Sequence, residues 1–497
     1  MLHIRVVKTK GKSRSVQVYR YQDSKRIIVK HIGSATTDEE IVLLEEMARI
    51  LIADYTKQSY LFEQARPKEE AVLVSQCQYL GVYYTYLYDV LKAVQYQIGY
   101  ALHVDTLLND LALMRIVEPA SKLRSIELME SYFGIKHRRQ RYYESARKWL
   151  DLKESIEKQT LAFARKQYSF DFSLLFYDVT TLYFETFTED ELRKNGFSKD
   201  NKSQQPQIVV ALMVTPKGFP VGYEVFSGNT FEGHTLIPVI KSFIKKHNVE
   251  HFTVVADAAM ISTDNIEALR AEKINYIVGA RLGNVSADLL TSIDTKLSRI
   301  DGHIIRVKTD NGYLICSFSQ KRYNKDKYEM QKQIQRAKSL LSQPSKVKRV
   351  KYLKSDDSNM VLNEKLIEKT TRLLGVKGYY TDIEESVADN ATIISRYHDL
   401  YKIEQAFRLS KHDLQARPVF HFKEEPIHLH ILICFMALAI SKHIELTAQT
   451  SIRAFLTHCK KITDARLLNK ITKREIKMRA PVSDELLHIV TNILRPH

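Results

Sequence analysis

Two aspartates lie where predicted core strands end, and such a pair has the residue types needed for metal-ion chemistry. Asp178 falls in the segment LLFYDVTTLYFE and Asp257 in TVVADAAMIS. A single aspartate that closes a strand is more often a helix cap or a turn residue, because its carboxylate accepts nearby backbone N–H groups. Two carboxylates at the ends of neighbouring strands repel each other unless a divalent cation is bound between them. Hard oxygen ligands of this kind favour Mg²⁺ or Mn²⁺ over zinc.

A third acid is offered by the segment RYHDLYKIEQAFRLSKHDL, residues 396–414. Glu404 follows Tyr397 by seven residues and precedes Lys411 by seven. Seven residues make nearly two helical turns, so these three side chains are expected along one helix face. Arg408 lies one turn beyond Glu404 on that face. The same spacing also fits a surface ion pair between Glu404 and Arg408, worth ~0.2–0.5 kcal/mol, and spacing alone does not separate the two interpretations.

The pattern between residues 170 and 282 predicts a sheet that could hold the two aspartates. Three apolar, β-branched and aromatic runs divided by turn residues predict an antiparallel meander. Helix and strand then alternate, which predicts an α/β fold with a mixed sheet covered by helices. The predicted strands are 172–179, 206–214, 219–226, 252–258 and 275–282, and the predicted helices are 235–247 and 263–272.

Two basic runs are candidates for contact with a polyanion. Residues 137–148, HRRQRYYESARK, contain five Lys or Arg residues and one acid, and residues 321–354 contain 12 and two. Either run fits a solvated surface as well as a phosphate-binding surface. The candidate polyanion contacts in these two runs are Arg138, Arg139, Arg141, Lys346, Lys348 and Arg349.

The composition favours a nucleic-acid partner over a membrane. The 497 residues include 75 Lys or Arg and 58 Asp or Glu, for a net charge of +17, and such an excess favours a polyanion. The apolar run 431–440 is half the ~20 residues of a spanning helix, and the N-terminus lacks an apolar signal core. The four scattered cysteines suit a reduced compartment. We therefore expect a cytoplasmic protein with no membrane partner.

Four motifs in order carry a family resemblance: YDVTTLYFE, GFPVGYEVFSGNTFEGHTL, VVADAAMIS and YKIEQAFRLSKHDLQARPVFH. Together they resemble the DDE transposases of bacterial insertion sequences, and more narrowly the insertion-sequence 4 family with its Tyr-x2-Arg-x3-Glu-x6-Lys signature. Tyr397, Glu404 and Lys411 match that signature, whereas its Arg position holds Leu400. Ala259 replaces the glycine of the family's second motif. The resemblance covers about residues 170–440.

This resemblance implies an RNase H-like core that holds Asp178, Asp257 and Glu404 around two Mg²⁺ or Mn²⁺ ions. It implies DNA cleavage at element ends and strand transfer, with terminal inverted repeats and target DNA as partners and a homodimer when two ends are bound. The same chemistry would serve a metal-dependent nuclease without transfer. A transposase-derived DNA-binding protein is a further alternative, but the intact acids disfavour it. A glycosidase with paired acids is another alternative, but the excess of basic residues disfavours it.

The expected domain organisation follows these motifs and composition changes. The resemblance further implies a nucleoid-associated bacterial protein in which Tyr397, Arg408 and Lys411 contact the DNA backbone. Leu400 is expected to pack inward, so that Arg408 takes the role of the arginine that relatives have at position 400. Helical residues 86–167 are expected to recognise the element end, with Arg138, Arg139 and Arg141 as DNA contacts. The expected segments are 1–65, a β-hairpin plus helix; 66–168, a helical DNA-end-binding region; 169–282, the first part of the catalytic core; 283–375, a basic, β-containing insertion; 376–445, the second part of the core; and 446–497, a basic helical tail.

Overall fold

The computed structural model describes residues 2–9, 11–56, 74–100, 105–197, 204–247, 249, 252–260, 262–310, 312–341, 350–356 and 359–495. The chain forms two compact units, each assembled from separate stretches of sequence. The smaller unit comprises residues 1–90, 127–136 and 454–489, and the larger unit comprises residues 91–126, 137–453 and 490–497.

The larger unit is built on an eight-stranded mixed sheet in the order β10-β11-β14-β9-β8-β5-β6-β7. The pairs β5–β8 and β8–β9 are parallel, and the other pairs are antiparallel. The strands are β5 (Leu174–Tyr183), β6 (Gln207–Val214), β7 (Pro220–Ser227), β8 (Thr253–Ala256), β9 (Asn275–Ala280), β10 (Ile304–Thr309), β11 (Gly312–Phe318) and β14 (Val376–Thr381). The predicted meander is therefore confirmed as β5-β6-β7, and the predicted mixed sheet is confirmed as well.

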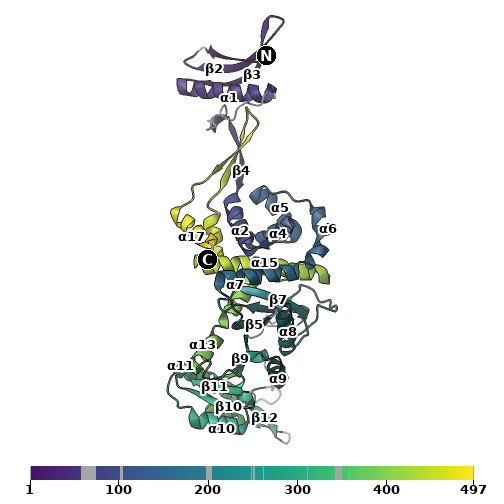
Figure 1. The fold of residues 1–497 in the computed structure, drawn as a ribbon, viewed down its shortest axis with the longest axis vertical. Helices are drawn as coiled ribbons and strands as arrows, with labels where there is room; N and C mark the ends of the chain where they lie inside the picture. The colour runs from purple at the N-terminus through teal and green to yellow at the C-terminus, as the bar shows by residue number, and fades with distance from the viewer. Residues whose placement is uncertain are drawn as a thin grey trace. The chain divides into compact units, whose positions relative to one another are not determined.

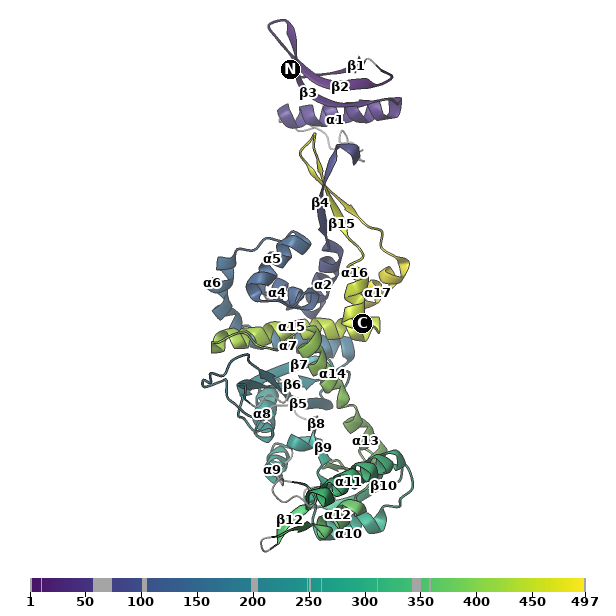
Figure 2. The ribbon, with the colours of Figure 1, turned by 180° about the vertical axis from the view of Figure 1, so that it is seen from behind.

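Helices flank this sheet, and their apolar side chains cover it. α15 (Glu424–Ala448) and α7 (Lys153–Tyr168) pack against β7 and against each other, as Figure 2 shows. α14 (Tyr401–Arg408) packs against β5 and β6, and α13 (Asn390–His398) packs against β8, β9, β10 and β14. By length and composition α15 could cross a membrane, but 94% of its most apolar window is buried inside the protein. A buried core helix of a soluble protein has the same properties, so this helix is weak evidence for a membrane span.

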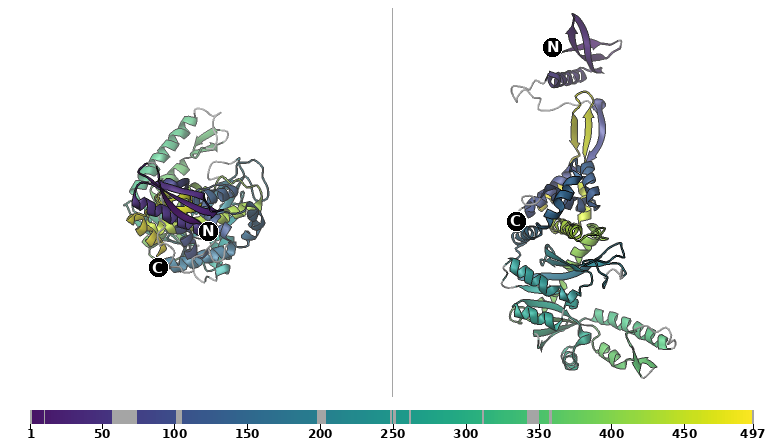
Figure 3. Two further views of the ribbon diagram at one scale, coloured as in Figure 1. Left: turned by 90° about the horizontal axis from the view of Figure 1, so that it is seen from above. Right: turned by 90° about the vertical axis from the view of Figure 1, so that its right-hand side faces the viewer.

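The segment 283–375 differs from the separate insertion expected from its sequence. Its first two strands, β10 and β11, extend the central sheet, because their alternating apolar residues share one core cluster with Leu282 and Val376. Only the following part stands apart, with a small core of its own around Met330, Ala337 and Tyr352. That part comprises α11 (Gln320–Leu341), the hairpin β12 (Leu353–Asp356) with β13 (Asn359–Leu362), and α12 (Glu364–Arg372), and it extends sideways in the right-hand view of Figure 3.

The smaller unit begins with a three-stranded antiparallel sheet of β1 (His3–Lys8), β2 (Arg14–Gln22) and β3 (Lys25–Ala35). The three alternating runs of this segment, expected to form a β-hairpin arrangement, are these three strands. α1 (Asp38–Thr56) covers one face of this sheet (Figure 1). Val16, Val18 and Ile32 from the sheet meet Leu44 and Met47 from α1 in its core.

The sequence predicts a helical C-terminal tail, but part of this tail forms strands. β15 (Asp464–Asn469) and β16 (Glu475–Arg479) form an antiparallel sheet with β4 (Cys77–Tyr83) in the order β16-β15-β4. Asp464 secures this arrangement, since it accepts hydrogen bonds from Thr85 and, at 2.7 Å, from Nε of Arg479. The strand partner β4 is almost 400 residues away in sequence, so no local pattern could reveal it.

Candidate active site

Asp178 lies on β5, and Asp257 directly follows β8, the parallel neighbour of β5. The pairing of β5 with β8 runs in register to Tyr177 and Ala256, so the next residue on each strand is one of the two aspartates. Neighbouring strands are ~4.8 Å apart, and residues opposite each other point to the same face of a sheet. Asp178 lies within β5 rather than at its end, because β5 continues to Tyr183 in its pairing with β6. The parallel pairing with β8, in contrast, ends one residue before Asp178.

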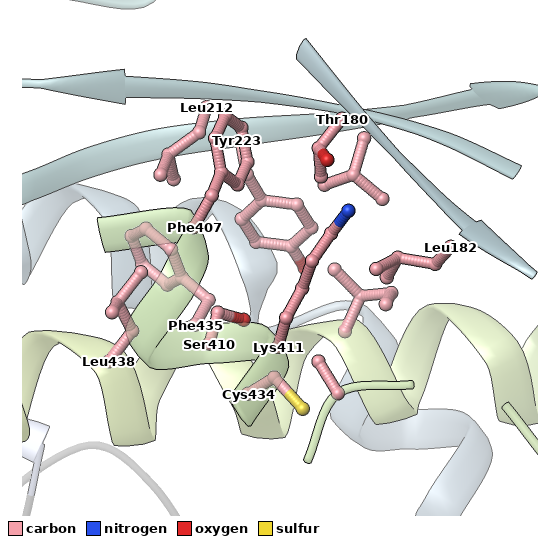
Figure 4. Close-up of a pocket in the computed structure, with 13 residues that line it drawn as sticks. Thr180, Leu182, Leu212, Tyr223, Phe407, Ser410, Lys411, Cys434, Phe435 and Leu438 are labelled. Atoms are coloured by element: carbon pink, nitrogen blue, oxygen red, sulfur yellow. The ribbon is translucent and has the colours of Figure 1, made fainter. Parts of the chain in front are cut away.

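The face that carries Asp178 is the face covered by α14. Thr180 and Leu182 alternate with Asp178 along β5 and therefore point the same way. Both line a pocket together with Phe407 of α14 and Lys411 of the turn that follows (Figure 4). The helix that carries Glu404 thus lies on the same side of the sheet as the two aspartates.

Tyr397 joins α13 to Asp257. Its hydroxyl donates a hydrogen bond to Oδ1 of Asp257 at 3.1 Å. The register places Asp257 opposite Gly279 of β9, and Gly279 opposite Tyr379 of β14. A Cβ atom at Gly279 would lie 2.5 Å from the Tyr397 hydroxyl oxygen, so the missing side chain provides the space that this hydroxyl occupies. Burial and the neighbouring carboxylates of Asp257 and Glu404 raise the pKa of Tyr397, which keeps the hydroxyl protonated as a donor.

Lys377 is a basic residue at this site that the sequence gave no reason to select. It lies on β14 two residues from Tyr379 and so on the same face of the sheet. Its ammonium is 4.9 Å from the ring centroid of Tyr397 and 5.4 Å from that of Tyr379. Burial and then the nearby Arg322 lower the pKa of Lys377, while the carboxylates of Asp257 and Glu404 oppose this effect. A positive charge is therefore held within the electrostatic reach of two of the three acids.

The turn after Asp257 is fixed by a buried asparagine. Nδ2 of Asn265 donates to the carbonyl oxygens of Gly233 at 2.6 Å and Met260 at 2.7 Å. The 3-10 turn of Ala258–Met260 follows Asp257 directly, and its first hydrogen bond runs from Met260 N to the Asp257 carbonyl. Asn265 thereby fixes the backbone turn that directly follows the exposed Asp257. The sequence offered no signal for Asn265, Gly279 or Lys377, because their roles depend on contacts with distant segments.

The helix expected around Glu404 is interrupted twice, which corrects the single face assigned to Tyr397, Glu404 and Lys411. α13 ends at His398, and the backbone around Leu400 forms i→i+3 hydrogen bonds before α14 begins. After Arg408 the chain continues as a π-helical turn, Leu409–Asp413, which changes the direction of later side chains. Lys411 consequently points toward β5 beside Thr180 in Figure 4. Leu400 is 7% exposed, as expected of an inward-packing residue.

The three acids are candidate ligands for a divalent cation, and they do not form a closed cage. Asp178 is half-buried, whereas Asp257 and Glu404 are exposed. Among the residues that the structure describes, no three Asp, Glu, His or Cys side chains already surround a common point. Mg²⁺ commonly keeps several waters and uses one or two carboxylates together with substrate phosphates. The adjacent carboxylates of Asp178 and Asp257 fit that mode of binding, with Glu404 on the helix above the same face.

The predicted DNA contacts outside the acidic site are only partly described. Arg138, Arg139 and Arg141 are exposed at the start of α6 (Arg139–Leu150), and Nη2 of Arg141 lies 2.9 Å from Oδ2 of Asp105. Arg408 is exposed at the end of α14. Lys346, Lys348 and Arg349 lie outside the described residues.

Comparison with known proteins adds a family match. Residues 169–440, more than half of the chain, match the family model described as Transposase DDE domain. A comparison with curated proteins gives no match. Among solved structures, the chain is similar to the cryo-EM structure of a piggyBac transposase synaptic complex with hairpin DNA, with 11% sequence identity over 92% of this chain and 77% of that one. The TM-score of 0.35 is too low for this likeness to support an inference about fold or function.

Proposed function

This chain belongs to the transposase DDE domain family, and from that premise we propose that it cleaves DNA at the ends of a bacterial insertion sequence and joins those ends to target DNA. Asp178, Asp257 and Glu404 are the catalytic acids of this proposal, on an RNase H-like core of the insertion-sequence 4 type. The observation that carries it is the register of β5 and β8, which sets two carboxylates side by side on the face covered by the helix of Glu404.

The acids would hold two Mg²⁺ or Mn²⁺ ions, because hard carboxylate oxygens are the donors these cations prefer. When bound, such ions activate a water or 3′-hydroxyl and stabilise the leaving oxygen of a phosphodiester. The protein's own part is to keep the acids in place. Asp178 is held within β5, Asp257 by the turn and by Tyr397, and Glu404 by the packing of α14 on the sheet.

Basic residues would place the DNA. Lys377, on the same face as the aspartates, provides a positive charge at the position of the reacting phosphate, and Arg408 is exposed on the helix of Glu404. Phosphate contacts of this kind position a nucleic acid without reading its sequence. Strand transfer needs two ends held together, so the proposed active form is a homodimer bound to two terminal inverted repeats, acting on nucleoid DNA in the cytoplasm.

The test is an assay that reports cleavage and joining separately. The full-length protein is incubated with Mg²⁺, a labelled duplex that carries the element end, and a target plasmid. Wild type should nick the end and produce joined plasmid, and chelation of the metal should stop both reactions. Asp178→Asn, Asp257→Asn and Glu404→Gln should each retain DNA binding and lose both products. Asp264→Asn, which removes an exposed acid from α9 (Thr263–Ala271), is the matched control and should remain active.

The alternatives give different products in this assay. Nicking without joined plasmid would indicate a metal-dependent nuclease, and binding without any cleavage would indicate a transposase-derived DNA-binding protein. Either outcome would refute the proposed function. Equal activity of wild type and Asp178→Asn would refute the assignment of the acids, even if the protein joins DNA.

A further inference from the structure

α1 covers one face of the N-terminal sheet, and the opposite face carries side chains that are not part of the core under α1. The pairing of its three strands places His3 opposite Tyr19 and Tyr19 opposite Ile28. Arg5 pairs in the same way with Gln17, and Tyr21 with Arg26. Because these residues alternate with Val16 and Val18 of the core, they point away from α1. We call this the outer face, consisting of His3, Arg5, Gln17, Tyr19, Tyr21, Arg26 and Ile28.

The outer face presents exposed aromatic and apolar surface together with guanidinium groups. Tyr21 is 52% exposed and Ile28 49% exposed. The guanidinium carbon of Arg26 lies 5.8 Å from the ring centroids of both Tyr19 and Tyr21, and its Nε donates to the Tyr21 hydroxyl at 3.0 Å. The guanidinium of Arg5 lies 5.7 Å from the Tyr19 ring. Arg5 also donates from Nε at 3.0 Å and from Nη2 at 2.8 Å to Oε1 of Gln17. Arginines that are already held by such contacts lose less side-chain entropy when they bind a partner.

Charge is divided between the sheet and its helix. Residues 1–35 contain nine Lys or Arg and one acid, a net charge of +8, whereas residues 36–56 contain one Arg and six acids, a net charge of −5. The acids begin in the first turn of α1 with Asp38, Glu39 and Glu40. The register places Arg5 and Arg26 on the outer face, while the acids of α1 lie on the opposite side of the sheet. A polyanion is therefore attracted to these two arginines and repelled by the helix, which favours the outer face.

The dimensions and the donors of this face fit duplex DNA. Three strands spaced ~4.8 Å apart give a width of ~10 Å, which a major groove ~12 Å wide can admit. Arginine forks and a glutamine amide are the groups that pair with base edges there, and apolar side chains contact thymine methyl groups. We propose that the outer face of the N-terminal sheet binds duplex DNA in the major groove, as a recognition surface separate from the acidic site. The proposal rests on the proposed function only in taking DNA as the partner.

The first experiment measures binding of the full-length protein to a random-sequence DNA duplex over a range of salt concentrations, in the presence of a metal chelator. The test variant is Arg5→Ala with Arg26→Ala, and the matched control is Arg20→Ala. Arg20 is also exposed on β2, but it alternates with Tyr19 and Tyr21 and so points to the other face. Binding to random-sequence DNA depends mainly on phosphate contacts, and each lost phosphate contact should reduce the salt slope by ~0.9, so the double variant should lose about 1.8 and the control nothing.

The outcomes separate this inference from the proposed catalysis. Binding without metal does not depend on the acids, so a protein that fails to cleave can still confirm the outer face. A salt slope of the double variant equal to that of Arg20→Ala, with both variants folded by circular dichroism, would overturn the inference. Duplex RNA is the second probe, because its major groove is deep and narrow and should exclude the sheet. RNA competing as well as DNA would also overturn groove binding, whereas competition by DNA alone supports it.

Discussion

Gly279→Ala is the substitution that most directly tests how the acidic site is held together. The new Cβ would lie 2.5 Å from Oη of Tyr397, 3.1 Å from its Cζ and 3.2 Å from Cβ of Ala258. Ordinary carbon contacts are ~3.5–4.0 Å, so the Tyr397 ring must move by about 1 Å. Tyr379 opposes this motion, because its ring centroid lies 4.9 Å from that of Tyr397. Such overpacking typically costs ~1–3 kcal/mol of stability.

The same displacement should reduce activity more than it reduces stability. A shift of about 1 Å lengthens the 3.1 Å bond from Tyr397 to Asp257 beyond hydrogen-bonding distance. Displacement of a site group by ~1 Å can slow a reaction ~100-fold. We therefore expect strand joining to fall by about that factor in Gly279→Ala, measured under single-turnover conditions, and the free energy of unfolding in urea to fall by about 1–3 kcal/mol.

Two further variants make this prediction specific. Gly283→Ala is the matched control, since a Cβ there meets nothing within 4 Å, and it should resemble wild type in both measurements. Adding Tyr397→Phe to Gly279→Ala removes the oxygen of the shortest contact, so the double variant should recover part of the lost stability without recovering activity. The reasoning is refuted if Gly279→Ala behaves like Gly283→Ala, or if the double variant is no more stable than Gly279→Ala alone.

Substitutions at four further positions test the site and the fold around it. Lys377→Ala should weaken binding of the cleaved end and reduce the salt slope by ~0.9. Lys377→Arg should retain the affinity and the salt slope of wild type. An unchanged slope in Lys377→Ala would contradict a phosphate contact. Leu400→Ala should lower the free energy of unfolding by ~2–5 kcal/mol. Arg408→Ala should melt like wild type and slow strand joining. A stable Leu400→Ala variant together with a destabilised Arg408→Ala variant that joins normally would refute the inward packing of Leu400 and the DNA contact of Arg408. Burial, followed by the charge of Lys122, lowers the pKa of His421 to about 4. The unfolded chain therefore binds more protons than the folded chain between pH 6.5 and 4, so stability should be lost as pH falls through this window, and less so in His421→Gln.

The sequence predicted the parts of the fold that depend on local pattern. The segments around β5 to β9 were recognised because their strands are continuous apolar runs and the helices between them are amphipathic. Asp178 and Asp257 could be selected because a carboxylate in such a run is unusual. The placement of β10 and β11 in the same sheet could not be predicted, since strand pairing depends on a partner, β14, that follows only after α11 and α12.

The interrupted helix shows why the third acid was harder to place than the two aspartates. Leu400, Ile403 and Phe407 continue a helical apolar period through the break, so periodicity alone predicts one helix. The structure has i→i+3 hydrogen bonds around Leu400 and a π-helical turn after Arg408, and neither changes the pattern of buried residues. The pattern therefore reports which residues face the core, but not the direction of the polar residues between them.

The site combines two different kinds of support, and this difference determines which substitutions should affect each acid. The aspartates depend on the backbone pairing of β5 with β8, which side-chain substitutions on α13 or α14 leave intact. Glu404 depends on packing, because α14 is short and is held by the buried Ile403, Ala406 and Phe407. Tyr397 of α13 adds a side-chain contact to Asp257 through its hydrogen bond. Loss of packing under α14 should therefore displace Glu404 alone, whereas loss of Gly279 should disturb Asp257 and α13 together.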